Sequence, residues 1–112
     1  MDIPQQFLIE IIDEAKADEV GLWFIIGRLR DDLGVEDSVL LQVATLQCVS
    51  QLLASGAVVA GYYRPDSSGI EVWDMEPERV VSRIKQAWNA LGREPDIGEI
   101  VVIIGNDCDA SR

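Results

Sequence analysis

Carboxylates are the side chains whose number and spacing bear most on the chemistry of this chain. Asp and Glu number 20 against 9 Lys and Arg, and there is no His. The densest group lies near the N-terminus: Glu10, Asp13, Glu14, Asp18 and Glu19. Paired carboxylates can hydrolyse glycosides, but that reaction needs a deep sugar cleft and usually a larger fold. The favoured interpretation is a solvated helix face that can also meet a partner.

Two other motifs deserve a chemical interpretation. Asp107-Cys108-Asp109 follows an apolar segment, and an Asp-x-Asp pair can hold Mg²⁺ or supply a nucleophile and an acid. Only three residues follow it, so we expect an acidic solvated tail. Ser67-Ser68-Gly69 is typical of a hairpin turn. A serine nucleophile there would need a general base, and a chain without His has no His to serve as one.

The residue types that are absent exclude several classes of site. Without His there is no Ser-His-Asp triad, no His general base and no zinc site with His ligands. No Gly-rich phosphate-binding loop occurs. We therefore predict a protein that is not an enzyme and that uses no cofactor and no metal.

The net charge of −11 argues against nucleic acid, whose binding is driven by Lys and Arg. An acidic surface instead favours a basic protein partner, with fast and salt-sensitive association. A second acidic group, Asp31, Asp32, Glu36 and Asp37, adds to the N-terminal one, and Tyr63 is a candidate aromatic anchor. Solubility alone is the competing explanation. The predicted partner-binding residues are Glu10, Asp13, Glu14, Asp18, Glu19, Asp31, Asp32, Glu36, Asp37 and Tyr63.

The elements that must position these residues follow from periodicity and caps. Apolar spacing predicts helices over 3–16, 20–33, 38–55 and 76–91, and strands over 57–63, 70–73 and 99–104. Asp2 is the expected cap of the first helix and Asp37 lies in the expected cap of the third; Gly34, Gly56 and Gly92 are expected helix stops. We predict one α+β domain over 1–105 and a flexible tail over 106–112.

Packing expectations follow from the same pattern. Leu22, Ile26 and Leu29 share one helical face, and Trp23 and Trp88 are assigned to the core. Arg28 is expected to pair with Asp31 or Asp32. The helix over 38–55 is apolar around most of its circumference, which predicts burial by its own domain or by a partner. The segment 99–104 is apolar on both faces, as expected of a strand that is central in its sheet or covered on both sides.

Three helices followed by a hairpin is the layout of a winged helix. The hairpin would be the wing, and the helix over 38–55 would be the recognition helix. That helix has no Lys or Arg, although Gln42, Gln47 and Gln51 are able to contact adenine. We therefore expect no nucleic-acid binding, and a DNA-binding regulator is the least favoured alternative.

Because the sequence shows no targeting signal, we expect a cytoplasmic location. The N-terminus has no basic segment followed by a long apolar run, so no signal peptide is expected. The uncharged segment 38–63 is long enough to span a bilayer, but it contains several Gln and Ser residues, and we predict no membrane association. Cys48 and Cys108 are expected to be free thiols.

Scattered positions along the chain carry a resemblance. They are Leu22-Trp23-Phe24, Ala44-Thr45-Leu46 with Leu52-Leu53, Gly61, and the run from Leu91 to Ile100. The chain resembles small bacterial winged-helix-like proteins. In size, acidity and absence of catalytic residues it also resembles, by type, immunity proteins of bacterial toxin systems, including contact-dependent growth inhibition. That resemblance implies a cognate basic toxin domain, such as a nuclease, bound one to one in the cytoplasm. It transfers no binding residues, because these proteins share no motif.

The main alternative is a regulatory or structural protein that forms a homodimer through its uncharged third helix.

Overall fold

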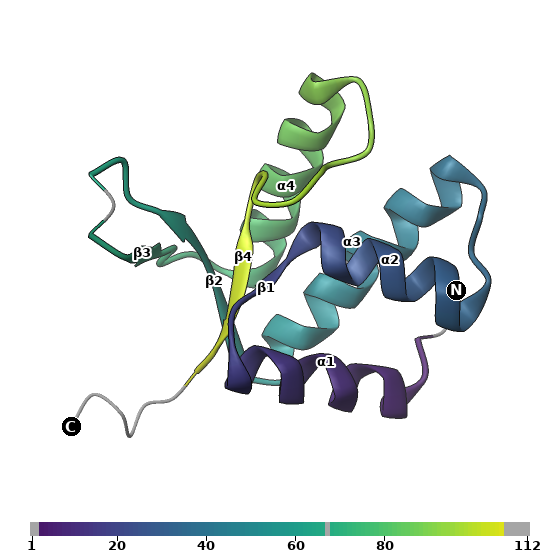
Figure 1. Cartoon of the computed structure of the whole chain (residues 1–112), viewed down its shortest axis with the longest axis horizontal. Coiled ribbons are helices and arrows are strands. Elements are labelled where there is room, and N and C mark those ends of the chain that lie inside the picture. The colour runs from purple at the N-terminus through teal and green to yellow at the C-terminus, as the bar shows by residue number, and fades with distance from the viewer. Residues whose placement is uncertain (1–2, 67, 107–112) are drawn as a thin grey trace.

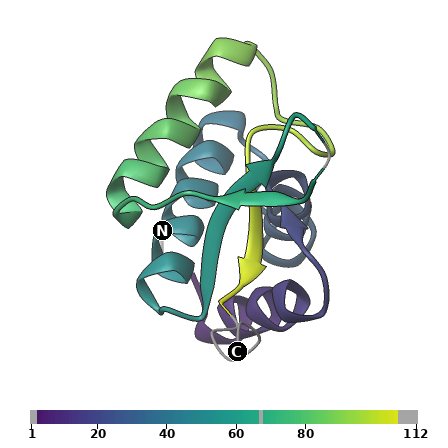
Figure 2. The same ribbon diagram turned by 90° about the vertical axis from the view of Figure 1, so that its left-hand side faces the viewer.

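The computed structural model describes residues 3–66 and 68–106 and has an α+β fold. Within them, four helices and four strands follow one another as α1 (Gln5–Ala17), β1 (Val20–Gly21), α2 (Leu22–Leu33), α3 (Ser38–Ala54), β2 (Val58–Tyr63), β3 (Ile70–Val72), α4 (Pro77–Leu91) and β4 (Val102–Gly105). The helices lie behind and beside β2 and β4 when the sheet is viewed face-on, and the β2–β3 hairpin projects away from α1, α2 and α3 (Figures 1 and 2). The α+β prediction is confirmed.

The sheet is antiparallel, with the strand order β1-β4-β2-β3. Ile103 of β4 lies opposite Val20 on one side and Ala60 on the other, so the last strand is central, as predicted. It begins at Val102 and not at Glu99, because Ile100 has a left-handed backbone with φ of 71°. That conformation interrupts an extended strand.

Strand β1 is a feature that periodicity did not predict. The expected helix over 20–33 begins at Leu22, because Val20 and Gly21 pair with β4. At the chain start, α1 begins at Gln5 with Pro4 as its N-cap, whereas Asp2, the expected cap, lies outside the described residues. Both differences are local, since Leu22, Ile26 and Leu29 of α2 are buried on one face as predicted.

The core forms where the four helices pack against one another and against β2 and β4. Its fully buried large side chains include Ile11, Leu22, Ile26, Leu29, Leu41, Leu52, Ile84 and Ile103. Trp88 is buried as predicted, but the assignment of Trp23 to the core is wrong, since 46% of its surface is exposed. Trp23 is one residue past Leu22, about 100° around the helix, and so lies off the buried face.

Helix α3 contacts α1, α2, α4 and β2 and is the central helix of the fold. The Asp37 carboxylate accepts bonds from the N–H groups of Val39 and Leu40, so the predicted cap is confirmed. One side of α3 is buried, yet Val39 and Val43 on another side are 69% and 50% exposed. No described helix has the length and apolar character needed to cross a membrane.

The hairpin depends on a close approach of its two strands. A Cβ on Gly61 would lie 2.4 Å from the backbone oxygen of Glu71 in β3, so a glycine is required there. Trp73, just after β3, lies half-buried against the core with the Arg83 guanidinium 4.2 Å from its ring centre. The hairpin is therefore fixed at its base, where it joins the core.

The first residue of the predicted tail, Asn106, is held by hydrogen bonds. It donates from its backbone N–H to Ala57 and from its side chain to the carbonyl of Gly56. Residues 107–112 lie outside the described part of the chain.

Candidate functional site

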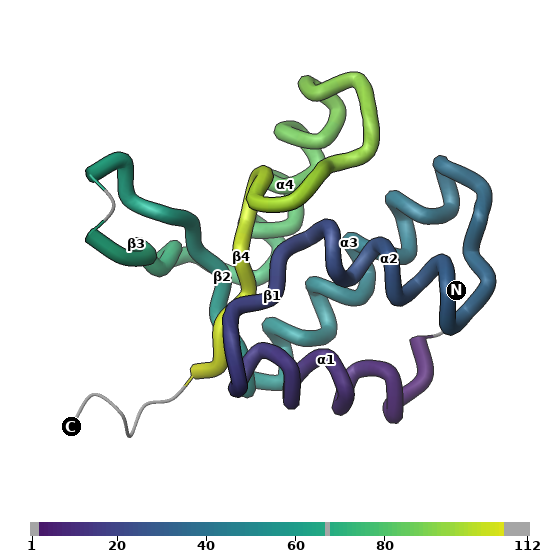
Figure 3. The backbone as a smooth tube through the Cα atoms, in the orientation of Figure 1, coloured from purple at the N-terminus to yellow at the C-terminus, as the bar shows by residue number. Residues whose placement is uncertain are grey.

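A cleft of about 280 Å³ lies where the end of α1, β1 and the start of α2 face the end of β2 and the loop before β4. In Figure 3 this loop descends from α4 into β4, which lies beside β1. The cleft is lined by Glu14, Asp18, Glu19, Val20, Gly21, Trp23, Phe24, Tyr63, Ile97, Gly98 and Val102. We call it the acidic–aromatic cleft.

Its acidic side is formed where α1 gives way to β1. The Asp18 carboxylate accepts from the N–H of Glu19 at 2.8 Å, which fixes the turn between the two elements. Asp18, Glu19 and Glu14 are exposed, and no Lys or Arg is among the described residues that line the cleft. The described lining therefore presents three carboxylates and no basic side chain.

Tyr63 joins this acidic side to the hairpin. Its hydroxyl donates to a carboxylate oxygen of Glu19 at 2.5 Å. That hydrogen bond, with smaller effects from burial and from the Glu19 charge, raises the pKa of Tyr63 to about 12. Tyr63 is 41% exposed, while the hydroxyl of the half-buried Tyr62 donates to the carbonyl of Gly98. Because successive side chains of a strand point to opposite faces, Tyr63 is the more exposed of the two tyrosines.

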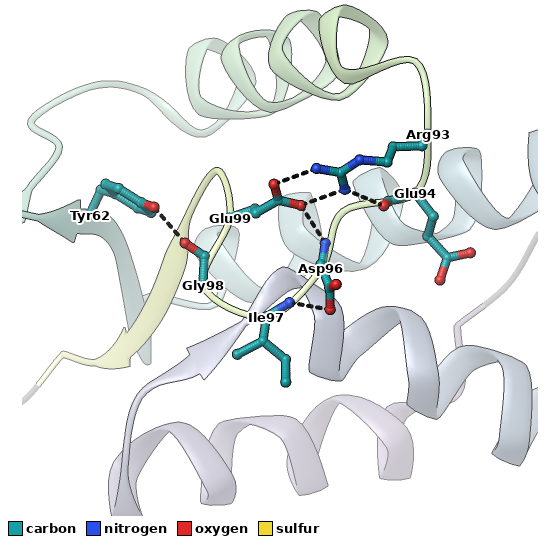
Figure 4. Close-up of polar contacts among 7 residues, drawn as sticks. All are labelled: Tyr62, Arg93, Glu94, Asp96, Ile97, Gly98 and Glu99. Atoms are coloured by element: carbon teal, nitrogen blue, oxygen red, sulfur yellow. Dashed lines mark hydrogen bonds and ion pairs between the residues drawn. The ribbon is translucent and has the colours of Figure 1, made fainter.

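The opposite side of the cleft is a loop held by its own hydrogen bonds (Figure 4). The Glu99 carboxylate accepts two bonds from Arg93 at 2.8 Å and one from the N–H of Asp96 at 2.6 Å, and these bonds lower the pKa of Glu99 to about 2. Asp96 in turn accepts from the N–H of Ile97. Ile97, between these anchors and Gly98, is 70% exposed. The loop therefore holds an apolar side chain in water.

This arrangement combines two kinds of recognition. Trp23 and Ile97 offer exposed apolar surface, and aromatic faces attract cations. The carboxylates beside them can form charge-assisted hydrogen bonds with Lys or Arg. The cleft is thus suited to a basic side chain presented by another protein.

Four of the ten predicted partner-binding residues, Glu14, Asp18, Glu19 and Tyr63, meet in the cleft. Glu10 and Asp32 instead both bind Arg28, each at 2.5 Å. The Arg28–Asp32 pair confirms a prediction. The Arg28–Glu10 pair joins two residues that are 18 positions apart in the chain, one on α2 and one on α1, and was not predicted. The Glu10 carboxylate therefore joins α1 to α2, the Asp32 pair lies within α2, and both carboxylates are partly neutralised.

The remaining predicted residues lie elsewhere. Asp37 caps α3, and Asp13 is exposed on α1 away from the cleft lining. Asp31 and Glu36 are exposed near the α2–α3 junction, and within residues 3–66 and 68–106 their side chains have no hydrogen bond or ion pair. The ten residues thus do not form one continuous surface.

Sequence reasoning missed the apolar half of the cleft. Trp23 had a usable signal, since its position around α2 lies off the Leu22–Ile26–Leu29 stripe. Ile97 had a weaker one: it is an isolated apolar residue in a polar turn.

The motifs weighed for catalysis are only partly described. Ser67, Asp107, Cys108 and Asp109 lie outside the described residues. Across the described ranges, no group of three or more Asp, Glu, Cys or His side chains is placed to hold a metal ion. Cys48 is buried, which raises the pKa of its thiol to about 12.

Comparison with protein-family models, curated proteins and solved structures found no match to this chain.

The Glu19–Tyr63 contact predicts a stability change at high pH. Because the folded state holds the phenol proton more tightly than the unfolded chain, the contact stabilises fully below about pH 10, and its contribution is lost as pH rises through about 12. Glu19→Ala removes the hydrogen-bond acceptor together with its charge, so the pKa of Tyr63 should fall toward its ordinary value. The pKa of Tyr63 can be measured from tyrosinate absorbance in a Tyr62→Phe background, in which Tyr63 is the sole tyrosine. An unchanged pKa would assign the shift to burial.

Proposed function

We propose that this protein is a non-enzymatic binding module that holds a basic partner protein in the acidic–aromatic cleft. The observation that carries the proposal is the exposure of Trp23 and Ile97 beside Glu14, Asp18 and Glu19. Large apolar side chains that stay in water as a group commonly mark an interaction site. Protein interfaces combine such an apolar centre with a polar rim, and the three carboxylates supply the rim.

The partner we propose is a basic toxin domain, with this chain as its cytoplasmic immunity protein. An enzyme that cuts nucleic acid carries basic surface for its anionic substrate, and an inhibitor with net charge −11 is attracted to the same surface. The resemblance in type to immunity proteins of contact-dependent growth inhibition supports this choice. Such a protein binds its toxin one to one and needs no cofactor.

We also propose that the fold is winged-helix-like. The order α1, β1, α2, α3 and a β2–β3 hairpin supports this, with the hairpin as the wing. The insertion of β4 between β1 and β2 is a departure from three helices and a simple hairpin. Helix α3, in the recognition-helix position, has no Lys or Arg and exposes Val39, Leu40 and Val43. These side chains favour a protein surface over a DNA groove.

The test compares two matched double variants. The toxin domain or other basic partner is first captured from the source cells by tagged protein and identified by mass spectrometry. Asp18→Asn with Glu19→Gln removes two charges from the cleft, while the amide oxygens can still accept the bonds from the Glu19 N–H and Tyr63. Asp31→Asn with Glu36→Gln removes the same number of charges from the α2–α3 junction, outside the cleft.

We expect the cleft variant to associate about tenfold more slowly at low salt and the control about as fast as wild type. The difference should shrink at high salt, since surface charges are screened over about 8 Å at physiological ionic strength. Equal rates for both variants would contradict the cleft as the interface. A slower control alone would move the interface to the α2–α3 junction.

A further inference from the structure

Helix α3 carries a second exposed surface that the proposed function does not use. Val39, Val43, Gln47, Ser50 and Ala54 follow one another at intervals of four, four, three and four residues, which places them on one helical face. Val39 and Val43 are largely exposed, and Gln47 and Ser50 are half-buried. We call this face the α3 stripe. None of its residues lines the acidic–aromatic cleft.

Charge determines which partner suits the α3 stripe. No Asp, Glu, Lys or Arg occurs between Ser38 and Tyr63. A basic protein gains nothing from such a face and is attracted to the cleft. A second copy of this chain, also of net charge −11, is repelled by the acidic surfaces but meets no charge on the stripe itself.

The order of residues along the stripe is self-complementary. If two α3 helices pair antiparallel about a twofold axis between their Gln47 residues, Val39 of one copy lies opposite Ala54 of the other, and Val43 lies opposite Ser50. The larger side chains of the N-terminal half thus meet the smaller ones of the C-terminal half. Within the described ranges Gln47 has no side-chain hydrogen bond, so the two Gln47 amides can bond to each other.

The antiparallel arrangement also separates like charges. Glu36 and Asp37 precede the N-terminus of α3, so in the pair they lie at opposite ends. At a rise of about 1.5 Å per residue, a helix of this length spans roughly 25 Å. That separation exceeds the Debye length of about 8 Å at physiological ionic strength. A parallel pair would place the four carboxylates side by side.

We propose that the α3 stripe binds a second copy of this chain, forming an antiparallel dimer that leaves the cleft free for its partner. Because the two copies still repel each other at long range, salt should strengthen this dimer. The cleft partner should bind more weakly in salt. Salt therefore affects the two interactions in opposite directions. If an experiment rules out one of them, the proposal for the other is unaffected.

Sedimentation equilibrium of the full chain at low and high salt tests the proposal. Wild type should reach twice its 12.4 kDa mass, at lower concentration in high salt. Val43→Asp places a charge in each half of the interface and should raise the dimer dissociation constant by about tenfold or more. Ile97→Asp, at a more exposed apolar residue outside the stripe, adds the same charge and should leave dimerisation close to wild type.

Cross-linking tests the register. In protein with Cys108→Ser, which retains the buried Cys48, Gln47→Cys should form a disulfide between copies, because the two residues 47 meet at the twofold axis. Val39→Cys should not, because its opposite residue is Ala54. A wild-type monomer at every salt concentration would overturn the proposal. A dimer indifferent to Val43→Asp, or one trapped by Val39→Cys and not by Gln47→Cys, would overturn it as well.

Discussion

Replacing Trp23 with alanine should weaken binding of the basic partner by about 2–4 kcal/mol, or roughly 30- to 1,000-fold in Kd. Trp23 is the largest exposed side chain in the acidic–aromatic cleft. A tryptophan at the centre of an interface is the residue type whose truncation most often produces a loss of this size. Its ring also offers a face to a Lys or Arg that the neighbouring carboxylates attract.

The matched control for Trp23→Ala is Val72→Ala. Val72 in β3 is about as exposed as Trp23 but lies outside the cleft lining. Both substitutions should leave the free energy of unfolding within about 1 kcal/mol of wild type, because each side chain is only partly buried. Calorimetric titration with the captured partner gives the two affinities. Equal affinities for Trp23→Ala and Val72→Ala would remove Trp23 from the interface.

Replacing Ile103 with alanine should lower the free energy of unfolding by about 2–5 kcal/mol. Ile103 is fully buried in β4 and lies opposite Val20 on one neighbouring strand and Ala60 on the other. Truncation therefore leaves a cavity where the sheet meets the helices. Since a domain of this size is typically stable by only about 5–15 kcal/mol, the variant should unfold at a much lower urea concentration.

Ile104→Ala is the control for Ile103→Ala. Ile104 is the next residue along β4 and its side chain points to the other face of the sheet, where it is only half-buried. The same substitution should therefore have a clearly smaller effect. If urea unfolding gave equal losses for both variants, β4 would be buried equally on both faces, against the structure.

Features set by neighbouring residues could be predicted from the sequence. The Leu22–Ile26–Leu29 face depends only on helical spacing, and the stop at Gly34 depends on its left-handed backbone, with φ of 70°. Strand β1 could not be predicted, because two residues carry no periodicity and Val20 becomes a strand only by pairing with Ile103. The same holds for the ion pair between Glu10 and Arg28.

The candidate site shows the same division. Its acidic residues were predicted because charge density is visible in the sequence. The assembly of Glu14, Asp18 and Glu19 with Tyr63, however, depends on the fold. Ile97 is exposed because Arg93, Asp96 and Glu99 bind one another and fix its loop, which is a tertiary result. Glu10 and Asp32 were assigned to a partner but contact Arg28.

Amide hydrogen exchange, measured with and without the captured basic partner, tests the central claim most directly. Binding in the acidic–aromatic cleft should slow exchange at residues 18–24, 63 and 97–98, which lie in three separate segments that line the cleft. Exchange in α3 should not change with the partner at constant dimer content. Slowed exchange confined to α3 or to the α2–α3 junction, with the cleft segments unaffected, would contradict the account.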